Sequence, residues 1–397
     1  MTDDQITRIL ASKPAAARLS RRQFLLGSTL SVVAGGFLLS GCGTSGGSSA
    51  SGSPAASGTG SATAGPIEAQ LHMYNWAQYD DPALPKAFTT QFGPAVQIDT
   101  YSSNEEMIAK LAAAQGTSGY DLVIPTGAYI PQMLQNNLLQ KLDKSLLPNL
   151  TNVDPQFLGR AWDPKNDYSV CKDWGSTGYF YDTTVIKRPM TSWQDFIDAA
   201  KAEASGKTAV LASPPELTAI YFWANGIPWT TEKTSDLDAA ENFCVNELAQ
   251  HIKAFDSYPA IPLTQGTYAL AECWNGDARQ GLLASKTPDR YKWVLPTPKT
   301  ELWMDNWAIV AGAKDPVAAH AWINYILDPK NSLTDMAYHG YNTGIKDIKT
   351  AAQTAGLKYL DVIFFTPDQL ATLETGEINS AEQRLIEIYG KTKAKAA

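Results

Sequence analysis

Residues 69–101 read AQLHMYNWAQYDDPALPKAFTTQFGPAVQIDTY, and this stretch decides the fold class. Its first six residues, 69–74, predict a strand, whereas 84–92 have the apolar spacing of a helix. Residues 95–101 alternate between apolar and polar side chains, as a half-buried strand does. The same order of strand and helix continues as far as residue 137. This alternation predicts an α/β fold with a mainly parallel sheet.

A second α/β stretch begins near residue 179. Helices are predicted at 193–204 and 237–254, and strands at 208–212 and 269–274. The part of the chain from residue 66 onward is longer than one hydrophobic core usually supports. We therefore expect two domains.

The N-terminal segment has the pattern of an export signal. Residues 20–25 read SRRQFL, a twin-arginine pattern, and an apolar stretch follows that ends in LSGC at 39–42. The last four residues resemble the lipobox of bacterial lipoproteins, in which the cysteine is acylated and becomes the new N-terminus. We expect 1–41 to be a signal peptide, and 42–65 to be the lipidated Cys42 with a flexible linker. The alternative is a short membrane anchor that stays attached.

Composition excludes several classes of function. The chain has 32 basic and 40 acidic residues, a formal net charge of -8, and no long basic run, which argues against a nucleic-acid-binding protein. Beyond the N-terminal segment no apolar run is long enough for a membrane span. The four histidines are scattered without metal-ligand spacing, so we expect neither a metal nor a cofactor.

Catalytic motifs are missing from the foldable part of the sequence. From residue 66 onward it contains no G-x-S-x-G elbow, no phosphate-binding G-x-x-x-x-G-K-[ST] loop and no H-E-x-x-H. Paired carboxylates in an aromatic cleft can cleave glycosides, and Glu272, Asp277 and Asp305 are available for that chemistry. An exported enzyme that acts on glycans is therefore the alternative to a binding protein.

Aromatic residues gather where predicted strands end. Trp76 and Tyr79 follow the first strand, Trp274 ends the strand at 269–274, and Trp303 stands two residues before Asp305. Ligands of open α/β sheets bind outside the carboxyl ends of the strands. Aromatic rings attract an ammonium group and cover methylenes, while a carboxylate neutralises the buried charge. This pattern favours a site for an organic cation.

The ordered blocks of the chain resemble a known family. Residues 74–79 read YNWAQY, and this pattern is similar to the Y-N-W-x-x-Y that opens the spermidine/putrescine-binding receptors of bacterial ABC importers. Further blocks that resemble this family follow in the same order, at 101–107, 120–126, 139–145, 174–178, 191–193, 274–276, 303–305 and 340–343.

The resemblance implies a type II periplasmic-binding-protein fold. In this fold two α/β lobes are joined by two crossing hinge segments, here near 174–179 and 303–306, and ligand binding closes the hinge. The implied lobes are 66–175 with 305–345, and 178–303 with 346–397.

The resemblance also implies a binding site between the lobes. Trp76 and Tyr79 would line the cleft from the first lobe, with Thr126 as a polar contact. Tyr341 would close the cleft.

Four further residues would complete this site. Trp274 and Trp303 would pack on the methylene chain of the ligand, and Asp305 would pair with an amine. Receptors of this family place two acids for a second ammonium after the strand at 208–212, whereas 213–217 read SPPEL and provide Glu216 alone. A di- or triamine, a monocation and an amine with its own carboxylate all stay open as ligands.

The sequence thus predicts a monomeric, lipid-anchored receptor that delivers a small amine to the membrane subunits of an ABC permease. It would lie in the periplasm or on the outer face of the cytoplasmic membrane. A metal receptor that uses Tyr179 and Tyr181 is a third possibility. Cys171 and Cys273 are expected to form the disulfide, because both lie near the implied cleft and crossing.

Overall fold

The computed structural model describes residues 66–116 and 118–397. The predicted signal peptide, Cys42 and the linker lie outside these residues. Within the described part of the chain, no helix is both long and apolar enough to cross a membrane.

One ten-stranded sheet runs through the described chain in the order β2-β1-β3-β9-β4-β7-β5-β6, with β10 beside β9 and β8 beside β4. Parallel pairs lie at its two ends: β1 pairs with β2 and β3, and β5 pairs with β6 and β7. The strands of these two ends are β1 (Gln70–Trp76), β2 (Ala95–Tyr101), β3 (Leu122–Val123), β5 (Thr208–Val210), β6 (Ile252–Phe255) and β7 (Leu270–Trp274).

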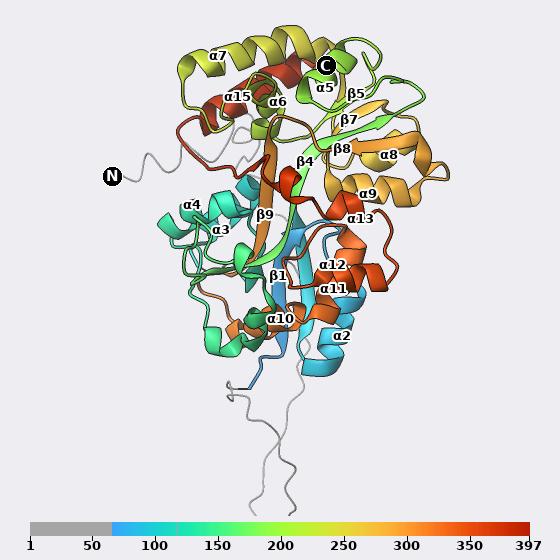
Figure 1. Cartoon of the computed structure of the whole chain (residues 1–397). Helices are drawn as coiled ribbons and strands as arrows, with labels where there is room; N and C mark the ends of the chain where they lie inside the picture. Colours follow the sequence, from blue (N-terminus) through green and yellow to red (C-terminus); the bar gives the residue numbers. More distant parts are fainter. Residues whose placement is uncertain (1–65, 117) are drawn as a thin grey trace, which may run out of the picture. The chain divides into compact units, whose positions relative to one another are not determined.

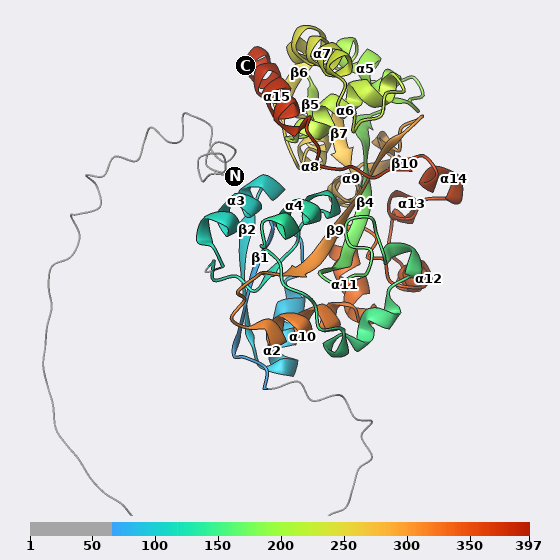
Figure 2. The same ribbon diagram turned by 90° about the vertical axis from the view of Figure 1, so that its left-hand side faces the viewer.

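Two long antiparallel strands connect the ends of the sheet. β4 (Ser169–Asp182) and β9 (Thr300–Ile309) pair from Ser169 opposite Ala308 to Ser176 opposite Leu302. Beyond this, β4 pairs with β7 and with β8 (Tyr291–Val294). Figures 1 and 2 show both strands passing from the lower group of elements to the upper one.

Helices pack around each end of the sheet and form two lobes (Figure 1). The first lobe has β1 to β3 and the helices α2 (Ala83–Phe92), α3 (Asn104–Ala114), α4 (Ile130–Gln135), α10 (Pro316–Ile326), α11 (Pro329–His339) and α12 (Ile348–Thr354). The second has β5 to β7 and α5 (Trp193–Lys201), α6 (Pro214–Ala224), α7 (Thr234–Asn242), α8 (Ala260–Thr264), α9 (Asn275–Ala284) and α15 (Glu382–Ala396).

Local sequence explains where several of these helices begin. The Ser192 side chain accepts from the backbone N–H of Asp195, whose carboxylate accepts in return, so α5 starts at a capping box. Ser103 caps α3, whose first turn holds Glu105 and Glu106, as the helix dipole favours. The predicted helix at 237–254 is confirmed as far as His251, since α7 continues into a π-helical and a 3-10 segment, and only its last three residues lie in β6 instead.

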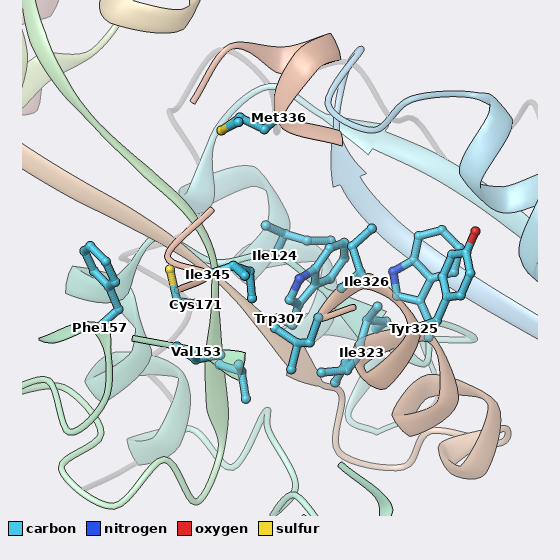
Figure 3. Close-up of a cluster of buried hydrophobic side chains, with 14 of the residues drawn as sticks. Ile124, Val153, Phe157, Cys171, Trp307, Ile323, Tyr325, Ile326, Met336 and Ile345 are labelled. Carbon is cyan, nitrogen blue, oxygen red and sulfur yellow. The ribbon is translucent and has the colours of Figure 1, made fainter. Parts of the chain in front are cut away.

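Each lobe has its own hydrophobic core. In the first lobe, Trp307 of β9 lies among aliphatic residues such as Ile124 and Ile323 (Figure 3). The core of the second lobe includes Trp193 and Trp223, whose rings stack with centroids 5.1 Å apart. Burial of such large side chains contributes most of the stability that folding gains.

The predicted bounds of the lobes need one revision. They assign 346–397 to the second lobe, but Ile348, Ile363 and Phe365 pack in the first core, while Ile388 packs in the second. Between them, β10 (Leu373–Glu374) pairs in parallel with β9. We therefore propose that the chain returns to the second lobe through β10 rather than directly after residue 345.

The predicted disulfide is wrong. Cys171, Cys244 and Cys273 are free, buried thiols. Cys171 lies opposite Asn306 on the first-lobe part of β4, whereas Cys273 lies opposite Gly178, seven residues further along that strand. This spacing is about 23 Å at the rise of a strand, far beyond the reach of a disulfide.

Candidate functional site

One face of the two crossing strands carries the candidate site. In the antiparallel pair of β4 and β9, Asp173 lies opposite Asp305 and Gly175 lies opposite Trp303. Opposite residues of such a pair share a face, and every second residue of a strand returns to it. Glu301, Trp303 and Asp305 therefore form a row along β9.

Asp173 and Asp305 form the first carboxylate group of this face. The Tyr79 hydroxyl lies 2.6 Å from Asp173 Oδ1 and 2.7 Å from Asp305 Oδ2. Thr126 Oγ1 donates to the other oxygen of Asp305 at 2.6 Å. A single phenolic proton cannot serve two carboxylates at once, so Asp173 and Asp305 compete for it.

Burial makes the negative charge of the first carboxylate group energetically unfavourable. Asp173 is fully buried and Asp305 is 5% exposed. Loss of solvation raises the pKa of Asp305 to about 7, and the negative charge of Asp173 adds to this effect. The same causes raise the pKa of Tyr79, so its phenol stays protonated and acts as a donor. A cation between these oxygens would stabilise both carboxylates.

A buried lysine lies directly beneath the first carboxylate group. Lys172 Nζ lies 2.8 Å from Asp335, 3.2 Å from Asp80 and 3.6 Å from Asp173. His339 Nε2 is 3.4 Å from Asp173. These groups are all buried, and desolvation outweighs the attraction of Lys172 at Asp80, raising the pKa of Asp80 to about 6.

The lysine network also fixes the position of a site residue. Lys172 Nζ donates to the backbone oxygen of Tyr79 at 3.2 Å and lies 4.4 Å from the centre of its ring. One lysine faces three aspartates here, and Asp305 adds a fourth carboxylate close by. The charge of this region is therefore negative on balance.

Aromatic rings enclose the row on β9. Trp303 meets Tyr341 edge to face with ring centres 4.7 Å apart, and Tyr341 lies 6.2 Å from Tyr79. A Cβ on Gly175 would overlap with the Trp303 ring, and one on Gly276 would overlap with Tyr341. Both glycines are thus needed for the close approach of these rings.

Glu216, Glu272 and Glu301 form a second carboxylate group at the other end of the row. Trp274 Nε1 donates to Glu216 Oε1 at 2.8 Å, and Thr177 Oγ1 donates to Glu301 Oε2 at 3.1 Å. Thr177 and Trp274 lie opposite each other in the pair of β4 and β7. The predicted residues Glu216 and Trp274 therefore lie together, next to an acid that the sequence did not single out.

The structure brings most of the predicted site residues to this one face. Tyr79, Thr126 and Asp305 are joined by hydrogen bonds, and Trp303 and Tyr341 are in ring contact. Trp76 has a different environment: its Nε1 donates to the Ile124 carbonyl and its ring packs on Tyr101 at 4.6 Å. The contacts of Trp76 are thus with the core behind the site.

Sequence reasoning missed two acids and one base of this region: Asp173, Glu301 and Lys172. It named Glu272 only for the alternative of a glycan-directed enzyme. The row at 301–305 reads ELWMD, and its period of two would have placed Glu301 on the face of Asp305.

Three of the residues named for the two alternative functions lie outside both carboxylate groups. Tyr179 and Tyr181 are buried in the second core, and the Tyr179 hydroxyl donates to the Ser192 carbonyl. Asp277 accepts from the backbone N–H of Ala260. Across 66–116 and 118–397, no group of three potential metal-ligating side chains is arranged to hold an ion.

Comparison with known proteins decides the family. Residues 83–358 match the family described as bacterial extracellular solute-binding protein. The chain belongs to this family. The spermidine/putrescine-binding periplasmic protein of Escherichia coli (strain K12) is 35% identical over 261 residues, 65% of this chain and 73% of that protein. The putrescine/agmatine-binding protein of Pseudomonas aeruginosa is 28% identical over 331 residues, 79% of this chain and 89% of that protein.

A solved structure of the family has the same architecture. The spermidine/putrescine ABC transporter substrate-binding protein of Streptococcus pneumoniae matches with a TM-score of 0.70 and 26% identity, over 83% of this chain and all of that chain. The predicted type II fold of two lobes is confirmed. Members of the family are extracellular or periplasmic solute-binding proteins of ABC importers, so the alternative of a glycan-directed enzyme is not supported.

Proposed function

We propose that this solute-binding protein captures a small organic polyamine and delivers it to the permease of an ABC importer. The observation that carries the proposal is the first carboxylate group, in which Asp173 and Asp305 share one phenol and are buried beneath aromatic rings. An ammonium ion supplies the charge and the donors that these oxygens need. The relatives named for spermidine, putrescine and agmatine support the same class of ligand.

The proposed mechanism is capture by closure of the two lobes. Asp305 and Trp303 lie on the crossing strand β9 itself, while Thr126 follows β3 in the first lobe and Trp274 ends β7 in the second. An amine held by Asp305 would therefore be contacted by both lobes when they close. Closure removes water from the charges and strengthens their attraction.

We further propose that Cys42 carries the lipid that anchors the receptor. The proposal rests on the lipobox-like LSGC at 39–42, and the segment from Gly43 to Gly65 would act as a tether. The mature protein would then work as a monomer in the periplasm or on the outer face of the cytoplasmic membrane, beside its permease.

A thermal-shift experiment tests the ligand class. The purified mature protein is heated with putrescine, spermidine or agmatine at millimolar concentration, and with 4-aminobutyrate as a zwitterion of similar length. We expect the amines to raise the melting temperature and the zwitterion to have little effect, because ligands stabilise the state that binds them. The variant Asp305→Asn should lose the shift, and Asp289→Asn, at an exposed position, should keep it. If no amine stabilises the wild-type protein, the proposal fails.

A further inference from the structure

Three glutamates from three elements converge at the second end of the row. Glu301 comes from β9, Glu216 from the first turn of α6 and Glu272 from β7. The three carboxyl groups lie close enough for the charge of Glu216 to raise the pKa of both Glu272 and Glu301. Thr177, opposite Trp274 on the neighbouring strand, donates to Glu301 Oε2 at 3.1 Å.

Oxygens of this group are buried without a donor. Glu216 is 5% exposed and Glu272 is fully buried, yet Glu216 Oε2 and Glu272 Oε1 have no hydrogen-bond partner among the residues described. The same holds for Nε1 of Trp303, the residue between the two carboxylate groups. Within the described chain, no lysine, arginine or histidine forms an ion pair with any of the three glutamates.

The titration of the three acids follows from this geometry. Loss of solvation is the largest cause at each site and raises the pKa of Glu216, Glu272 and Glu301. The charge of Glu216 raises the pKa of the other two further. Neutral donors such as Trp274 and Thr177 orient the oxygens but bring no positive charge.

The strand sets the distance between the two carboxylate groups. Glu301 and Asp305 are four residues apart on β9, which corresponds to about 13 Å between their Cα atoms. From bond lengths of about 1.5 Å, an extended amine with spacers of three and four methylenes has terminal nitrogens about 11 Å apart. A diamine with four methylenes spans only about 6 Å on the same basis. The aromatic Trp303 lies between the two groups, where the methylene chain would pass.

We propose that Glu301, with Glu216, forms a second ammonium subsite, so that the protein selects triamines that reach both carboxylate groups over short diamines. This inference rests on the proposed function and names the ligand within that class. In this subsite Glu301 supplies from β9 the second acid that the segment 213–217 lacks. The buried Glu272 lies behind Glu216 and adds negative charge without needing to touch the ligand.

Calorimetric titration of the mature protein with spermidine and with putrescine at pH 7.5 tests the subsite. In Glu301→Gln, we expect spermidine to bind about 10- to 100-fold more weakly, whereas the affinity for putrescine changes less than about threefold. Glu374→Gln is the matched control, because Glu374 pairs in register with Glu301 from β10 but forms an exposed ion pair with Lys299. Its affinities should stay within about twofold of the wild type.

The outcomes separate the subsite from the proposed function. The subsite is overturned if Glu301→Gln keeps its affinity for spermidine, or if its affinity falls equally for both amines. In either case, amine binding by the wild-type protein still supports the receptor role. A wild-type protein that binds neither amine overturns both. Thermal unfolding of the variant without amine shows whether it is folded, and removal of one of three crowded acids should raise its melting temperature.

Discussion

Replacement of Asp305 by Asn tests whether the charge of the first carboxylate group is uncompensated. Burial first, and the neighbouring Asp173 second, raise the pKa of Asp305 from 3.8 to about 7. Between these two pH values the folded protein holds a proton that the unfolded chain has released. The stability contributed by this proton is complete at low pH and is lost as the pH rises to about 7.

The size of the effect follows from the pKa difference. A pKa raised by about three between the unfolded and the folded state corresponds to about 4 kcal/mol of unfolding free energy. Since Asp305 interacts with other buried ionisable groups, we expect an observed effect of about 2–4 kcal/mol. The amide of Asn has the shape of the carboxyl group without its charge. Without amine, Asp305→Asn should match the wild type near pH 4 and exceed its stability by this amount at pH 8.

Urea unfolding followed by tryptophan fluorescence at pH 4, 6 and 8 measures this difference. Asp289→Asn removes an exposed carboxylate and should behave like the wild type at each pH. Calorimetry with spermidine at pH 8 should show that the more stable Asp305→Asn has lost its affinity. If Asp305→Asn is instead destabilised to the same extent at all three pH values, the carboxylate is compensated within the fold and the reasoning is refuted.

Two further substitutions probe the support of the site. Lys172→Met leaves three buried carboxylates without their cation. The unfolding free energy measured by urea titration at pH 7 should therefore fall by about 3–5 kcal/mol. An unchanged unfolding free energy would mean that Lys172 and the three aspartates have no net attraction. Gly175→Ala places a Cβ against Trp303 and should lower stability by about 1–3 kcal/mol and weaken amine binding, whereas Gly390→Ala, with open space around it, should do neither.

The elements of the first lobe could be predicted because their periodicity is local. β2 has the predicted bounds, β1 differs from the prediction by one residue at its start and two at its end, and the helix α2 differs by one residue at its start only. The helix predicted at 237–254 is confirmed to His251, but its predicted end is three residues too late, because a short half-buried strand, β6, follows without a strong stop signal. Here the pairing with β5 decides the conformation, and pairing is not visible in the sequence.

Position after a strand identified loop residues that the fold brings together. Tyr79 and Thr126, each on the loop after a first-lobe strand, both reach Asp305. Asp173 could not be found in this way, because β4 is buried along all of its 14 residues and has no polar face to read. Only the register with β9, set by long-range pairing, brings Asp173 opposite Asp305.

The distribution of built-in positive charge explains why the two carboxylate groups would act differently on a ligand. Lys172 sits against Asp173, so the first group already shares one internal ammonium and leaves Asp305 as the acid for the ligand. The second group has no such lysine among the described residues, and its glutamates depend on a charge from outside. A monoamine would satisfy Asp305 and leave the glutamates to bind protons. An amine with two or more charges that is long enough to pass Trp303 neutralises both carboxylate groups at once. The length of the amine therefore separates strong binding from weak binding.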